Sequence, residues 1–237
     1  MLQPTTFFIH GWAANARIWQ NAYGTNRSHY YDAPHYPDSI HLHEAFIDIS
    51  RRNKNPLTLV GWSLGGMLAI QLAALYPDRI GKLILISSTP RFTASETYSA
   101  GLPPTIIKRL IKKLSRDKWQ TQLDFYKLMF STTEQVYAKQ YTNTLAPLMA
   151  DIPFSTLAAG LDYLLQVDLR DILTQVIVPC DVIHGTADTV CPVSAGYYLS
   201  DHLPTAKLHL LKDAGHIPFY TRAQDFQLLI KECIGYD

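Results

Sequence analysis

The stretch GWSLG at 61–65 has the pattern G-x-S-x-G, the signature of a nucleophilic serine on a sharp turn. An apolar run at 57–60 precedes it, and leucines at helical spacing follow it over 64–75. At such a strand-to-helix turn the serine hydroxyl projects into solvent, and larger side chains two residues to either side would collide with the turn. The helix dipole also favours negative charge that develops beside the serine. We therefore predict that Ser63 is a catalytic nucleophile.

A serine hydroxyl needs an adjacent base, and that base needs an orienting acid. The chain offers Asp188 in HGTAD, just after a predicted strand at 178–183, and His216 in DAGH, just after a predicted strand at 207–211. Both therefore follow segments typical of buried strands, at the edge of a parallel sheet where α/β folds build their sites. The order serine, acid, histidine is also the order of α/β-hydrolases. We predict His216 as base and Asp188 as its orienting acid.

Other histidines and acids fit these roles less well. Asp213 is the main rival of Asp188, but it lies only three residues from His216 on the same loop. His184 is expected to support the acid loop rather than to act as base. His29, His35, His41 and His43 precede Ser63 and would break the order. Six histidines in all are expected in solvated loops or on the surface: His29, His35, His41, His43, His202 and His209.

A second loop is expected to complete the site. His10-Gly11-Trp12 follows the apolar run at 6–9, where α/β-hydrolases supply one of two oxyanion-binding amides. We predict the backbone N–H groups of Trp12 and Leu64 as the donors. The Trp12 side chain is free to pack in the core while its amide donates.

The elements that must position these residues follow from hydrophobic periodicity. Strand-like runs alternate with helical periodicity in the first ninety residues, and the alternation resumes at Val178. Between them, helical periodicity dominates from Pro104 onward. We predict an α/β fold with a mostly parallel sheet, a core formed by residues 1–90 and 166–237, and a helical cap inserted at 91–165.

Composition limits the class of protein. The 237 residues are 47% hydrophobic and 17% charged, with a formal net charge of +1, which disfavours a uniformly basic nucleic-acid binder. Three cysteines cannot all pair and match no zinc-binding spacing, so we expect reduced thiols and no metal. Neither a signal peptide nor a run of eighteen apolar residues is present, so the expectation is a cytoplasmic protein without a membrane span.

Several short sequence motifs, distributed along nearly the whole chain, resemble those of a known family. HGW at 10–12, GWSLGG at 61–66 and AGHIPF at 214–219 are similar to those of the α/β-hydrolase superfamily. SSTPRF at 87–92 and GLDYLLQVDLR at 160–170 are more discriminating. With them the chain resembles the pimeloyl-acyl-carrier-protein methyl ester esterases of biotin synthesis.

The resemblance implies a specific reaction. In that family the methyl ester of a pimeloyl chain on acyl carrier protein is hydrolysed through an acyl-enzyme at the serine, without a cofactor. The cap segment at 125–129 aligns with the family's acyl-chain contacts, although such a stripe is equally typical of a cap-helix core. The substrate-binding residues implied in this way are Trp12, Ser63, Leu64, Phe125, Tyr126, Lys127, Leu128, Met129 and His216.

The stretch at 105–118 has a charge pattern that is informative independently of any family resemblance. Its apolar residues fall on one arc of a predicted helix, and the stretch carries six positive charges and one negative. A solvated helix face and a membrane-surface helix both fit this pattern. A docking surface for an acidic protein fits it too, and acyl carrier proteins are strongly acidic. The predicted docking residues are Lys108, Arg109, Lys112, Lys113 and Arg116.

Three other functions remain open at this point. A general short-chain carboxylesterase would use the same triad without a carrier protein. Another small-molecule hydrolase or lyase would differ in its cap pocket, and a non-catalytic receptor could keep the triad. Dehalogenases and epoxide hydrolases are disfavoured because they need aspartate in place of Ser63. We expect a monomer.

Overall fold

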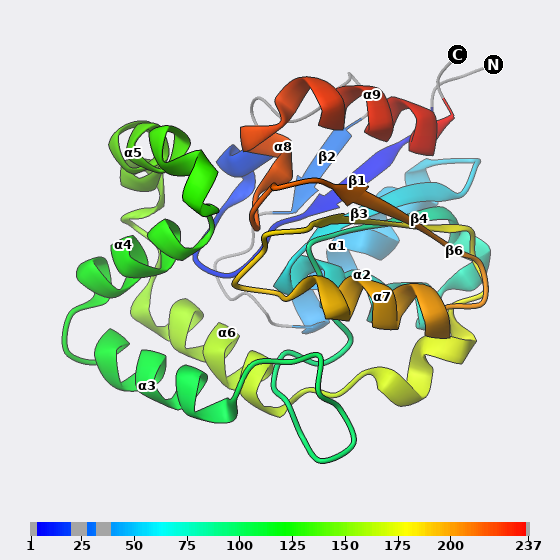
Figure 1. Ribbon diagram of the computed structural model, residues 1–237. Helices are drawn as coiled ribbons and strands as arrows, with labels where there is room; N and C mark the ends of the chain where they lie inside the picture. Colours follow the sequence, from blue (N-terminus) through cyan, green and yellow to red (C-terminus); the bar gives the residue numbers. More distant parts are fainter. Residues whose placement is uncertain (1–3, 20–27, 32–38, 236–237) are drawn as a thin grey trace.

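The computed structural model describes residues 4–19, 28–31 and 39–235. Within these residues the chain forms a parallel sheet with the strand order β2-β1-β3-β4-β5-β6 (Figure 1). The predicted α/β class with a mostly parallel sheet is thus confirmed. The strands are β1 (Thr6–Ile9), β2 (Ser28–Tyr31), β3 (Leu57–Trp62), β4 (Ile80–Ile86), β5 (Cys180–Gly185) and β6 (Ala206–Leu211).

Helices cover both faces of this sheet, which explains why its central strands are continuous apolar runs. In β1, the Phe7 ring packs on Phe46 of one face, with ring centroids 6.2 Å apart, and the Phe8 ring packs on Trp19 of the other, at 5.2 Å. Figure 1 shows α1, α2 and α7 on one side of the sheet and α9 on the other. The elements of these layers are η1 (Ala16–Trp19), α1 (Ser39–Arg52), α2 (Leu64–Leu75), η2 (Pro77–Arg79), α7 (Val193–His202), α8 (Pro218–Thr221) and α9 (Ala223–Ile234).

The remaining helices lie between β4 and β5 in the chain, and all but the last of them gather at one end of the sheet (Figure 1). We call this region the cap. Of the described helices, none is both long and apolar enough to cross a membrane. The cap elements and the short helix that follows them are α3 (Pro104–Leu114), α4 (Lys118–Leu128), η3 (Thr132–Glu134), α5 (Gln135–Thr144), η4 (Ala146–Met149), α6 (Phe154–Gln166) and η5 (Arg170–Gln175).

The single helix expected over 105–118 is wrong in its length. Helix α3 ends at Leu114, and the Asp117 side chain accepts a hydrogen bond from the Gln120 amide at 2.9 Å and so caps a second helix, α4. Lys118 points away from the basic face of α3, because its ammonium donates to the carbonyls of Ala150 and Ile152. Arg116 lies beyond the helix end.

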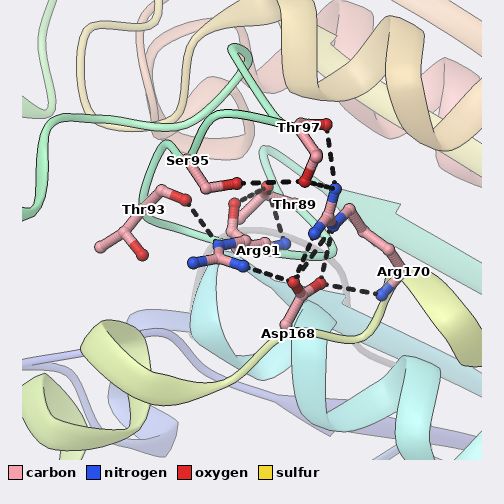
Figure 2. A network of polar contacts seen from close by, with 7 residues as sticks. All are labelled: Thr89, Arg91, Thr93, Ser95, Thr97, Asp168 and Arg170. Carbon is pink, nitrogen blue, oxygen red and sulfur yellow. Dashed lines mark hydrogen bonds and ion pairs between the residues drawn. The ribbon is translucent and has the colours of Figure 1, made fainter.

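A polar clamp fastens the two ends of the cap to each other (Figure 2). The carboxylate of Asp168, at the cap exit, pairs with Arg91 at the cap entry over 2.5 Å and with Arg170 over 2.7 Å. Arg170 also donates to the Thr97 carbonyl, and Arg91 to that of Thr93. The clamp therefore ties the segment that leaves β4 to the one that returns toward β5.

We expect Asp168→Asn to lower the melting temperature near neutral pH and to flatten its dependence on pH in acid. Hydrogen bonds from Arg170, with those from Arg91, outweigh burial and hold the pKa of the Asp168 carboxyl at about 2, below its ordinary 3.8. Such a group stabilises the fold above pH 3.8, and this stabilisation is lost as the pH falls toward about 2. Because the clamp is partly solvated, the loss should not exceed about 1 kcal/mol. Thermal unfolding across this pH range checks it, and identical slopes for both proteins would contradict it.

Candidate active site

Ser63 stands at the turn from β3 into α2 in a strained conformation, with φ 56° and ψ −122°. The turn leaves no space for side chains two residues away. A Cβ added to Gly61 would lie 2.5 Å from the Gly65 carbonyl oxygen, and one added to Gly65 would collide with the carbonyls of Ile9 and His10. The glycines of the G-x-S-x-G pattern are therefore required by close backbone packing.

The structure brings Ser63, His216 and Asp188 into one hydrogen-bonded chain. His216 Nε2 lies 2.9 Å from Ser63 Oγ, and His216 Nδ1 lies 2.8 Å from Asp188 Oδ2. The other carboxylate oxygen of Asp188 accepts the amides of Val190 and Cys191, each at 2.9 Å. A carboxylate only accepts, so Nδ1 carries the proton and Nε2 is left to accept from the serine hydroxyl. This arrangement suits general-base activation of Ser63.

The loops that carry the acid and the histidine are hydrogen-bonded to each other. The Ala187 amide donates to the Ala214 carbonyl at 2.9 Å, and the Asp213 amide donates to Thr186 Oγ1 at 2.8 Å. The indole N–H of Trp62, next to Ser63, donates to the His216 carbonyl at 2.9 Å. The three loops therefore hold one another in place.

Asp213, the alternative acid, and His184, the second histidine, lie close to this site but outside the hydrogen-bonded chain of Ser63, His216 and Asp188. Asp213 is exposed, and its backbone carbonyl, not its carboxylate, accepts a hydrogen bond from Ser131. His184 is fully buried, and burial lowers its pKa below the ordinary value, so it is neutral. Its Nε2 lies 2.8 Å from the Cys191 carbonyl and 3.5 Å from Asp188 Oδ2. It thus packs against the acid loop.

The loop after β1 passes directly beside Ser63. A Cβ added to Gly11 would lie 3.0 Å from Ser63 Cβ, so the peptide that leads into Trp12 is adjacent to the serine. Leu64 is the first residue of α2. Both amides therefore flank Ser63, and their use as oxyanion donors stays a prediction. The Trp12 indole donates to the Leu157 carbonyl at 2.8 Å, which anchors the cap to this loop.

A cavity of about 390 Å³ opens onto Ser63 between the core and the cap. Its walls are mainly apolar, and charged side chains occur on the α3 and α4 walls: Arg109, Lys113 and Asp124. Lys113 pairs with Asp124 at 3.6 Å. The apolar wall residues are Trp12, Phe92, Leu102, Ile106, Ile107, Leu110, Phe125, Leu128, Leu161, Leu164 and Val190.

Of the cap segment at 125–129, Phe125 and Leu128 are the members on the cavity wall within the described residues. The Tyr126 hydroxyl donates to the Ala13 carbonyl at 2.8 Å, so this ring is part of the cap-to-core contact. Lys127 is exposed, and Met129 is buried and accepts a hydrogen bond from the His216 amide through its carbonyl.

Sequence reasoning missed most of the cavity wall. Ile106, Ile107 and Leu110 lie on the apolar face predicted for a helix. A helix face that packs against the core and one that lines a cavity have the same periodicity, so the pattern does not distinguish them. No sequence pattern indicates that Thr189 and Val190, on the loop of Asp188, line the cavity.

One cluster outside this site has metal-ligand chemistry. Asp181, His209 and Cys233 place ligand atoms within 4.8 Å of one another, with His209 Nε2 2.6 Å from Asp181. The Lys82 ammonium already pairs with the Asp181 carboxylate, so the cluster fits an ion-pair network. It lies near the start of β5, away from the nucleophile. The expected surface position of His209 is wrong, because this ring is half-buried against Asp181.

Comparisons with known proteins agree with this architecture. The profile of the alpha/beta hydrolase family matches residues 7–226. Among curated proteins, the pimeloyl-[acyl-carrier protein] methyl ester esterase of Nitrosomonas europaea is 32% identical over 233 residues, covering 94% of this chain and 92% of that protein. The protein of the same name from Vibrio vulnificus is 29% identical, covering 94% and 91%.

Solved structures also share the fold. The bromoperoxidase of Bacillus anthracis has a TM-score of 0.89 at 20% identity, covering 98% of this chain and 92% of that one. An esterase from Exiguobacterium antarcticum has a TM-score of 0.83 at 22% identity, with the same coverage.

Proposed function

This chain belongs to the alpha/beta hydrolase family, and from that membership we propose that it is a serine carboxylesterase that hydrolyses the methyl ester of pimeloyl-acyl carrier protein in biotin biosynthesis. The observation that carries the proposal is the hydrogen-bonded chain of Ser63, His216 and Asp188 at an apolar cavity. The names of relatives that align with almost the whole chain support the substrate.

In the proposed reaction Ser63 Oγ attacks the ester carbonyl and passes its proton to His216 Nε2. The amides of Trp12 and Leu64 stabilise the oxyanion. Collapse of the tetrahedral intermediate breaks the bond to the methoxy oxygen, which takes the proton from His216 and leaves as methanol, so that an acyl-enzyme remains. Water then attacks that ester with His216 as base, which frees the carboxylate and restores Ser63. Asp188 orients His216 in both steps.

The cavity supports an extended acyl substrate. Its apolar wall, with Trp12, Phe125 and Leu128 near one another, suits a methylene chain. Its charged rim, with Arg109 and Lys113 on α3, suits the region where the chain leaves for its carrier.

The surface of α3 beside this rim supports an acidic partner. Lys108, Arg109, Lys112 and Lys113 are exposed, and a shallow groove runs along this face, lined by Thr105, Lys108, Arg109, Ile111, Lys112 and Ser115. A dense patch of one sign steers association and sets orientation. We infer that the carrier protein docks here.

We expect Lys108→Glu/Lys112→Glu to lower kcat/KM for pimeloyl-acyl-carrier-protein methyl ester about tenfold or more, with no change on a short p-nitrophenyl ester. These two lysines are chosen because they line the groove and not the cavity, whereas Lys113 lines the cavity. Steady-state kinetics at low and high salt provides the measurement.

A matched control is Lys54→Glu/Lys231→Glu, which makes the same change in net charge at exposed positions away from α3. It should leave both activities unchanged. If the α3 double variant retains wild-type kcat/KM on the carrier-protein substrate, docking at α3 is wrong. If the wild type cleaves only the short ester, a general short-chain carboxylesterase is the better assignment.

A further inference from the structure

The cap segment 128–134 contacts both loops that carry the catalytic groups. Thr189 of the acid loop donates to the Leu128 carbonyl at 3.0 Å. The His216 amide donates to the Met129 carbonyl at 2.7 Å, and Ser131 Oγ donates to the Asp213 carbonyl at 2.9 Å. The segment therefore contacts the loop of Asp188 and the loop of His216, and we call residues 128–134 the brace.

Glu134 is the charged residue within this brace. Its side chain is buried, with 2% of the residue exposed, and Oε2 accepts the amides of Ser131 and Gly215, each at 2.9 Å. Gly215 immediately precedes His216. The Glu134 carboxylate thus links Ser131 of the cap to Gly215 of the His216 loop, which is 81 residues from Glu134 in the sequence.

The contact is too close for most other residues. A Cβ added to Gly215 would lie 2.5 Å from the Met129 carbonyl oxygen and 2.8 Å from both Glu134 Oε2 and the Ser131 nitrogen. Glu134 Oε1 is also buried, and within the described residues it has no hydrogen-bond partner. Leaving such an oxygen unpaired is unfavourable. Glu134 also completes a capping box with Ser131 at the start of η3, and its hydrogen bond from Gly215 goes beyond that local role.

We propose that Glu134 is a positioning residue for the proposed hydrolysis, which holds the His216 loop at the distance from Ser63 that proton transfer needs. The inference rests on the proposed roles of Ser63 and His216. Because Leu128, in the same brace, lines the acyl cavity, the brace also links the cap wall to the base. A displacement of about 1 Å in a catalytic group costs on the order of a hundredfold in rate.

The test compares Glu134→Ala, Glu134→Gln and Gln122→Ala on a short p-nitrophenyl ester. Glu134→Ala removes both acceptors, and kcat is expected to fall about ten- to a hundredfold with little change in KM. Glu134→Gln keeps one oxygen acceptor and should recover most of kcat. The rate of Ser63 labelling by a small fluorophosphonate should fall in parallel with kcat, because it needs the same base.

Gln122→Ala is the matched control, since Gln122 is equally buried but its amide donates within the cap, to Tyr126 and the Met149 carbonyl. It should lower the melting temperature without lowering kcat. If it lowers kcat as much as Glu134→Ala, the role is merely structural and the inference is overturned. Should Glu134→Ala not fold, Ser131→Ala tests the same brace, with a fall of about threefold expected and wild-type kcat contradicting the proposal.

Ser63→Ala, assayed alongside, distinguishes a failure of the role of Glu134 from a failure of the proposed function. If it is inactive while Glu134→Ala keeps wild-type kcat and labelling rate, only the role of Glu134 fails. If Ser63→Ala is as active as the wild type, the proposed function and the role of Glu134 fail together.

Discussion

Ser63→Ala is expected to abolish ester hydrolysis, with kcat lowered by about 10⁶. The substitution removes the oxygen that would attack the carbonyl, and His216 has no other hydroxyl at its Nε2 among the contacts of the described residues. Stability should hardly change, because alanine and serine have similar strain at φ 56° and the backbone hydrogen bonds of the turn are kept. Steady-state kinetics on a short p-nitrophenyl ester and a thermal melt measure both quantities.

The control for this experiment is the fluorophosphonate label. It should modify the wild type at Ser63 and leave Ser63→Ala unlabelled, while Ser155→Ala, at an exposed position on α6 of the cap, should behave as the wild type. Residual turnover within about tenfold of the wild type would mean that another group is the nucleophile. Lost activity together with a lowered melting temperature would instead point to a damaged turn.

The sheet could be predicted from sequence because its strands are covered on both faces. A strand buried on both sides reads as a continuous apolar run, so 6–9 and 57–60 marked β1 and the first part of β3. The strand positions also predict the loops of Asp188 and His216, although β6, which precedes His216, is only partly buried. His209 shows the limit of this argument: in β6 it alternates with leucines, as Lys207 does, and this pattern gives no indication of its buried partner, Asp181.

The cap was harder to predict because its helices pack on one another and line a cavity with the same apolar side chains. Periodicity located the helices, but it could not reveal that α3 ends at Leu114 before Asp117 caps α4, nor that Tyr126 faces the core while Leu128 faces the cavity. For Glu134, the S-x-x-E pattern at 131–134 indicates a helix start but not the contact with the His216 loop. Its partner there, Gly215, lies 81 residues away, and only the folded chain brings them together.

Asp188→Asn is expected to lower kcat by about 10⁴ while the fold is kept. The reason lies in the two amides of Val190 and Cys191, which both donate to one oxygen of the side chain. In the variant the carboxamide oxygen must face these donors, so its NH₂ group faces His216 Nδ1. Nδ1 then has to accept, and the imidazole proton moves to Nε2.

A proton on Nε2 points at Ser63 Oγ and removes the acceptor that the serine hydroxyl needs, so the variant keeps its geometry but loses its base. Kinetics on a short ester, the fluorophosphonate labelling rate and the melting temperature together test this, and the first two should fall while the third stays. Asp213→Asn is the matched control, because Asp213 is exposed and its carboxylate is expected to play no part; its kcat should stay within about twofold of the wild type. If Asp213→Asn loses more activity than Asp188→Asn, the orienting acid is Asp213, and the hydrogen bond between Asp188 and His216 serves only to hold the two loops together.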